Sequence, residues 1–231
     1  MSELRFSWPP IQRPVGPWVG VFLTWESKYD CWHTGVLYRG SSDTVYSLHL
    51  VGHWDFQTDK PKGNEWCIKL NVPQARLPAV TAFLRRVQKN HSRIPYGFSS
   101  AEQAWFNSVT GGLRDAVIGE GLTCITFVLA LLAGAGLPLT IPETWPTRED
   151  DEVQKSEWVE RFSHNRAVMG PDEGSHFDAI IETPNEVRIR LSELLGAATD
   201  VTLPSQFERA RILGLQLRSE ICMHFSRLPP A

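Results

Sequence analysis

The stretch CWHTGVLYRGSSDTVYSLHL, residues 31–50, predicts two adjacent antiparallel strands. Its two halves are rich in Val, Leu, Tyr and Trp, residue types that favour extended backbone. Between them, RGSSDT supplies the Gly, Ser and Asp residues that are typical of a hairpin turn. We therefore expect strands over 31–40 and 44–52, joined by a tight turn.

The hairpin carries one histidine on each strand. A three-residue loop, Gly40 to Ser42, places His33 directly opposite His49, with Cβ atoms about 5 Å apart. A register slip of one residue would send the two imidazoles to opposite faces of the sheet. The expected pairing puts one imidazole in position to orient the other.

Further strands and helices follow from the same criteria. Expected strands cover 19–27, 65–72 and 175–183. Expected helices cover 77–90, the segment after Cys124, 185–198 and Ser205 to about Phe225. A partial helix is expected over 101–116. The Pro- and acid-rich stretch 137–152 is interpreted as a solvated surface excursion. Strands first, then helices, with a late strand, predict an α+β fold.

Composition excludes several classes of protein. The chain has 231 residues, 42% hydrophobic content and a net charge of −3, with no Lys/Arg stripe, so we expect one globular domain that does not bind nucleic acid. The N-terminus has no apolar signal region, and the uncharged run 127–139 is shorter than the roughly twenty residues a transmembrane helix needs. The expected location at synthesis is the cytoplasm, with signal-independent export as the route out of the cell.

Cys124 is the first candidate for chemistry. The four cysteines are widely spaced without a CxxC pair, which argues against a zinc knuckle or a disulfide framework. Cys124 opens the most apolar helix, just after Gly119, Gly121 and Thr123. A helix N-terminus stabilises a thiolate, and its N–H groups can bind an oxyanion. The alternative is that Cys124 is a small core residue.

A nucleophilic cysteine needs a base, and His33 is the expected one, with His49 orienting it. His53 replaces His49 if the strand register differs, and His176 with Asp178 forms an outside alternative pair. A metal site made by His33, His49 and Cys124 lacks a fourth ligand, so we expect nucleophilic catalysis without metal or organic cofactor.

Two blocks of the chain resemble a known family. The pattern C-x-x-F-V-x(6)-A-G-L-P, from Cys124 to Pro138, resembles the nucleophile helix of NlpC-type cell-wall peptidases, which are papain-like cysteine hydrolases. H-T-G-V-L-Y…H-L, from His33 to Leu50, resembles the strand that carries their base and the strand after it. The histidines precede the cysteine, an order that resembles the circularly permuted branch, which includes the lecithin–retinol acyltransferase group.

The resemblance implies a papain-like antiparallel sheet packed against a nucleophile-bearing helix, with extra C-terminal helices. The single domain then has a core over about 15–183 and a helical elaboration over about 184–231. Tyr96, in the loop IPYGFSS, corresponds to the tyrosine that lines the substrate cleft in the peptidases. Tyr96 and Thr123 are therefore the candidate substrate-binding residues.

The resemblance also implies an activity. It points to a cysteine hydrolase acting on an amide bond in peptidoglycan stem peptides, delivered by a secretion system as an antibacterial effector, with an immunity protein as a further partner. The permuted branch implies a different substrate, a lipid ester or thioester. The third hypothesis is a non-catalytic binding domain in which Cys124 is structural.

Overall fold

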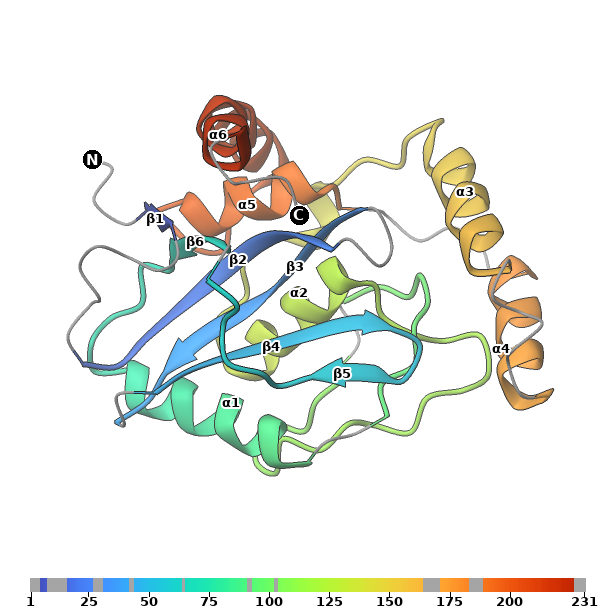
Figure 1. The fold of residues 1–231 in the computed structure, drawn as a ribbon, viewed down its shortest axis with the longest axis horizontal. Coiled ribbons are helices and arrows are strands. Elements are labelled where there is room, and N and C mark those ends of the chain that lie inside the picture. Colours follow the sequence, from blue (N-terminus) through green and yellow to red (C-terminus); the bar gives the residue numbers. More distant parts are fainter. Residues whose placement is uncertain are drawn as a thin grey trace.

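Six strands form one antiparallel sheet in the order β1-β6-β2-β3-β4-β5 (Figure 1). The structure is a computed structural model that describes residues 5–7, 16–26, 31–41, 44–63, 65–90, 93–101, 104–163, 171–182 and 189–226. The strands are β1 Arg5–Ser7, β2 Trp18–Glu26, β3 Cys31–Arg39, β4 Val45–Gly52, β5 Asp55–Gln57 and β6 Trp66–Lys69. Four of them, β2, β3, β4 and β6, match expected strands, whereas the short β1 and β5 were not expected.

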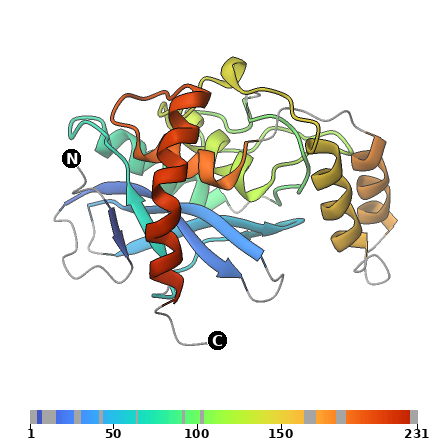
Figure 2. The same ribbon diagram turned by 90° about the horizontal axis from the view of Figure 1, so that it is seen from above.

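Helices follow the strands, which confirms the α+β class. They are α1 Leu77–Asn90, α2 Cys124–Gly134, the 3-10 helix η1 Pro142–Thr144, α3 Asp151–Ser163, α4 Pro171–Glu182, α5 Leu191–Thr199 and α6 Phe207–Ser226. Figures 1 and 2 show α3 and α4 side by side at one end of the sheet. Among the described residues, no helix combines the length and the apolar character that crossing a membrane requires.

Two expected elements are wrong. The stretch 175–183 is not a strand, because it lies mostly in α4, where the buried side chains of His176, Phe177 and Ile180 recur at helical spacing. The described part of 101–116 contains no helix and instead forms an isolated antiparallel bridge between Phe106 and Leu113. In both places the local pattern of apolar residues was compatible with the two-residue period of a strand and with the 3.6-residue period of a helix.

The sheet has two distinct faces. On the first, the helix face, strand residues such as Val21, Val36 and Leu48 join one core with α1, α2 and α5. The second face carries a smaller apolar cluster made by Trp18, Phe22, Leu37, Val45 and Cys67. Successive strand residues point to opposite sides, and paired residues share a side, so the register assigns each strand residue to one face.

A chain crossing covers the second face. Because β5 pairs with β4 while β6 pairs with β2, the connection between β5 and β6 has to pass β4, β3 and β2, and Figure 1 shows it in front of the sheet. At the edge of β4, where this connection begins, the Ser47 N–H and hydroxyl both donate to Asp59 O, at 2.8 and 2.9 Å. We call this second side the connection face.

Of the two C-terminal helices, α5 packs on the sheet and α6 packs on α5. Helix α5 packs on β6 and β2 and contributes Leu194 and Leu195 to the main core. Helix α6 approaches α5 at glycines, since a Cβ on Gly196 would lie 1.8 Å from Ala210 O. Helix α6 adds Ala210 and Leu217 to that core, so both helices of the expected C-terminal elaboration contribute to it.

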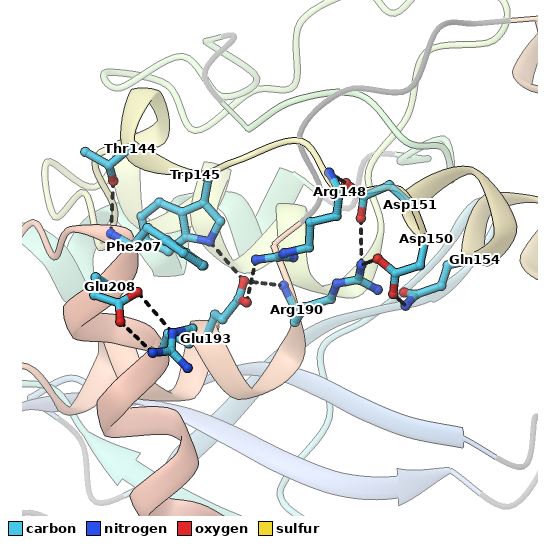
Figure 3. A network of polar contacts seen from close by, with 11 residues as sticks. Thr144, Trp145, Arg148, Asp150, Asp151, Gln154, Arg190, Glu193, Phe207 and Glu208 are labelled. Carbon is cyan, nitrogen blue, oxygen red and sulfur yellow. Dashed lines mark hydrogen bonds and ion pairs between the residues drawn. The ribbon is translucent and has the colours of Figure 1, made fainter.

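The stretch 137–152 is not a simple solvated excursion. Trp145 is buried, and its Nε1 donates to Glu193 Oε2 at 3.0 Å. Arg148 contacts Glu193 at 2.6 Å, and Arg190 contacts the buried Asp151 at 2.7 Å. Figure 3 shows these ion pairs joining the start of α3 to the start of α5. The charge run is thus partly a buried network that holds the stretch in place.

Two glycine substitutions test the helix packing. We expect Gly196→Ala to destabilise the protein by about 3 kcal/mol or more, because the added methyl would meet the α6 backbone. Gly174→Ala, in α4 with open space around it, should instead stabilise the protein by about 0.5 kcal/mol or more. Urea unfolding measures both, and equal stabilities would contradict the α5–α6 contact.

Candidate functional site

Cys124 is the first residue of α2, and Thr123 caps that helix. The Thr123 hydroxyl accepts the Thr126 N–H at 3.1 Å, and the Thr126 hydroxyl accepts the Thr123 N–H at 2.8 Å. The other N–H groups of the first turn have no acceptor within the helix. Because the Cys124 thiol is half-buried at this positive end, it lies where a thiolate is stabilised. Thr123, the expected substrate contact, is occupied as a helix cap.

The segment before Cys124 lies along the IPYGFSS loop. Leu122 N donates to Pro95 O at 2.9 Å, and Ser99 N donates to Gly121 O at 3.0 Å. A Cβ on Gly121 would lie 2.4 Å from the carbonyl carbon of Tyr96, so glycine is needed there for packing. The absent side chain of Gly121 is thus used for contact with the IPYGFSS loop. Tyr96 itself is buried at 4% exposure, so its ring is not the wall of an open cleft.

The two predicted histidines are in contact. His33 Nε2 and His49 Nδ1 are 2.9 Å apart, and both side chains are buried. The register differs from the expected one, because Arg39 pairs with Val45 and five residues, not three, connect the strands. His49 therefore lies beside Gly35, whose Cβ would be 2.6 Å from the His49 Cβ. A shift of two residues keeps both histidines on one face, so they meet as diagonal neighbours.

That face is the connection face, not the helix face. His33 pairs with Thr24, and both histidine rings contact the edge of Phe22, at 6.5 and 5.7 Å between centroids. Phe22 belongs to the cluster on the connection face, whereas α2 packs on the helix face. The structure thus brings His33 and His49 together and presents them to the side of the sheet opposite α2. At this end of β3 the helix face carries Thr34 instead.

Burial keeps the His33 imidazole neutral. Loss of solvent, together with the neighbouring His49 and Lys62, lowers the pKa of His33 to about 3. Lys62 belongs to the β5–β6 connection, which agrees with the cover that this segment provides. The neutral His33 imidazole, hydrogen-bonded to His49 and packed against Phe22, is a stable element of this second layer.

A second pair of histidines lies beside the segment that leads to Cys124. The ladder between β4 and β5 contains an irregularity between Leu50 and Gly52, and His53 follows it. Such a bulge re-aims the next side chain. His53 Nδ1 accepts the Tyr96 N–H at 3.1 Å, and the His53 ring lies 4.4 Å from the ring of His176.

His176 completes this arrangement from α4. Its Nδ1 accepts the Gly119 N–H at 3.1 Å, and its Nε2 contacts Tyr96 O at 2.8 Å. From the sequence, His53 was expected as the alternative to His49, and His176 was expected to pair with Asp178. Gly52, inside a strand-like run, is the signal that could have indicated the bulge and hence the direction of His53.

The remaining cysteines differ in setting. All four are free thiols, as expected, and Cys67 is buried, which raises the pKa of its thiol. Cys31 is half-buried on β3, and Cys222 is exposed on α6. Within the described ranges, no three His, Cys, Asp or Glu side chains are arranged to hold a metal ion.

Comparison with known proteins adds no family. No protein-family model, no curated protein and no solved structure matches the chain. The NlpC-type resemblance rests on the two sequence blocks alone.

The buried histidine pair predicts a pH-dependent stability. The unfolded chain binds a proton at His33 below its ordinary pKa of about 6.5, whereas the folded chain does not until about 3. Stability is therefore lost as the pH falls from 6.5 towards 3. Between pH 7.5 and 5.0, we expect the loss in His33→Gln to be about 2 kcal/mol smaller than in wild type. Urea unfolding at both pH values measures it, and equal losses would show that His33 ionises normally.

Proposed function

We propose that the protein is a cysteine-dependent hydrolase that cleaves an amide bond, with Cys124 as its nucleophile. The observation that carries the proposal is the half-buried thiol on the first residue of a helix capped by Thr123. Among the four cysteines, Cys31 and Cys67 lie on strands and Cys222 lies far along α6, so only Cys124 has this setting. The N-terminal dipole of α2 favours negative charge at the position of this thiol.

The proposed reaction has two steps. The Cys124 thiolate attacks the carbonyl carbon, the S–C bond forms, the C–N bond breaks, and the amine leaves with a proton from solvent. Water then attacks the thioester carbonyl, which releases the carboxylic acid, restores the thiolate and returns a proton to solvent. First-turn N–H groups of α2 stabilise the negative oxygen in both steps.

The catalytic base proposed here differs from the one expected from the sequence. His33 as base and His49 as its orienting partner would have to act on the α2 side, but both belong to the connection face. We therefore attribute thiolate formation to the helix N-terminus, and we place the histidine contribution with His53, whose ring contacts Tyr96 beside the Cys124 segment.

Stem peptides of peptidoglycan are the first substrate class of this proposal. Delivery by a secretion system and an immunity-protein partner are proposed only together with this substrate class. A lipid ester or thioester is the second candidate, favoured by Trp25 and Trp32. These residues pair on the helix face, with ring centroids 5.1 Å apart and exposures of 40% and 39%. Exposed aromatic surface of this kind suits an apolar chain.

Thiol reactivity tests the nucleophile directly. We expect iodoacetamide at pH 6 to alkylate Cys124 at least tenfold faster than the exposed Cys222, because only Cys124 is stabilised as a thiolate. Mass spectrometry of tryptic peptides measures each rate. His33→Ala should leave the rate at Cys124 unchanged. Equal rates at Cys124 and Cys222 would return Cys124 to a structural role, and a large slowing in His33→Ala would restore His33 as its partner.

Product analysis tests the substrate. We expect purified muropeptides incubated with the wild-type protein to lose an amide bond, detected by mass spectrometry, and Cys124→Ala to leave them intact. The same pair of proteins is incubated with lipid extracts. Cleavage of lipid esters alone would replace the amide proposal by the ester one. No Cys124-dependent product from either source would contradict the hydrolase.

A further inference from the structure

The backbone N–H and the backbone C=O of Tyr96 are each hydrogen-bonded to an imidazole. Gly119 N–H donates to His176 Nδ1, His176 Nε2 contacts Tyr96 O, and Tyr96 N–H donates to His53 Nδ1. We call these three hydrogen bonds the histidine relay. They join α4, the IPYGFSS loop, the turn after β4 and the segment that leads to Cys124.

The partners dictate the protonation of both rings. A carbonyl oxygen only accepts, so His176 Nε2 carries the hydrogen that reaches Tyr96 O, and its Nδ1, which accepts from Gly119 N–H, is bare. His53 Nδ1 accepts from Tyr96 N–H, so a neutral His53 carries its hydrogen on Nε2. The two bonds of His176 then run in the same direction through one ring, and each polarises the other. His53 Nε2 is buried and has no hydrogen-bond partner among the described residues.

We propose that His176 and His53 are positioning residues for Cys124, which hold the segment Gly119–Thr123 in place as long as both imidazoles are neutral. The role of Cys124 in this inference rests on the proposed function, whereas the relay itself does not. His176 acts through Gly119, five residues before Cys124, and His53 acts through Tyr96, which packs against Gly121. A proton on either Nδ1 would place two donors face to face and break the bond.

The surroundings favour the neutral state. Burial, His176 and Arg93 lower the pKa of His53 to about 4, and burial lowers the pKa of His176. Other charged groups near the relay are Asp115 and Arg114 in the groove beside His176, and Glu120, which follows Gly119 and pairs with Arg114 at 2.9 Å. Asp178 on α4 and Lys155 of α3, which donates to Ile181 O, complete this set. Two imidazolium rings 4.4 Å apart would also repel each other.

Acid should therefore open the relay. The closed state binds fewer protons than the open one, in which each histidine regains its ordinary pKa of about 6.5. As the pH falls from 6.5 towards 4, opening becomes more favourable, by up to tenfold per pH unit for each histidine. Opening frees the Gly119 and Tyr96 amides and loosens the approach to Cys124.

Glutamine provides the matched variant, because its amide oxygen and nitrogen are spaced like the two ring nitrogens and it cannot take a proton. We expect His176→Gln to keep wild-type hydrogen-exchange protection of the Gly119 and Tyr96 amides at pH 7 and to lose less of it at pH 5, after correction for intrinsic rates. His176→Leu should lower that protection at least tenfold and slow iodoacetamide alkylation of Cys124 several-fold. His33→Gln, on the connection face, is the control and should change neither.

Nitrogen-15 NMR of the wild-type protein reads the tautomers without any variant. We expect both His53 and His176 to carry hydrogen on Nε2 alone at pH 7. A charged ring or an Nδ1–H tautomer would overturn the proposal, as would unchanged protection in His176→Leu or the same acid response in His176→Gln as in wild type. These readouts need no turnover, so an intact relay with no Cys124-dependent hydrolysis would contradict the hydrolase and not the relay.

Discussion

The alternation of side chains along β3 and β4 is the constraint on which the rest of the molecule depends. Residues that pair across the ladder share a face, so Val36 and Leu48 together enter the core beneath α1 and α2. Gly35, the residue before Val36, faces the other side and leaves room there for Phe22 and for the His49 Cβ. This alternation sends the His33–His49 pair to the connection face and leaves α2, with Cys124 at its start, on the other.

Much of this fold follows from the sequence, and the failures have physical causes. Long periodic segments such as Leu77–Asn90, and strands rich in Val and Leu such as Trp18–Glu26, are read correctly because burial dictates their pattern. The segment 175–183 failed because the Ile180–Ile181 pair is β-branched, while the long-range contacts of His176 and Phe177 decide for helix. Tertiary contacts of this kind override local propensity.

The candidate site shows the same limit at finer scale. The sequence brought His33 and His49 together correctly, because a two-residue error in the turn keeps the face of every side chain. It could not tell which face α2 covers, since that depends on a connection that crosses from β5 to β6 on one side of the sheet. The pairing of His53 with His176 depends on a bulge and on a helix more than a hundred residues later, and no local pattern reports such a contact.

Backbone groups, more than side chains, connect the parts around Cys124. The backbones of Pro95, Gly97 and Ser99 hydrogen-bond to Gly121 and Leu122. Two imidazoles, those of His53 and His176, bind the Tyr96 N–H and C=O in turn. An arrangement of this kind fixes the position of the start of α2. The N-terminus of that helix contributes electrostatic stabilisation to a thiolate placed there.

The most direct test of this account is a crystal structure of the protein after reaction with chloroacetamide, which attaches a carbonyl group to a reactive thiol. The account predicts one adduct, on Cys124, with its carbonyl oxygen near the first-turn N–H groups of α2, while His33 remains hydrogen-bonded to His49 on the far side of the sheet. A structure in which a His33 ring nitrogen lies within hydrogen-bond distance of Cys124 Sγ would contradict the separation of the two faces and restore the triad expected from the sequence.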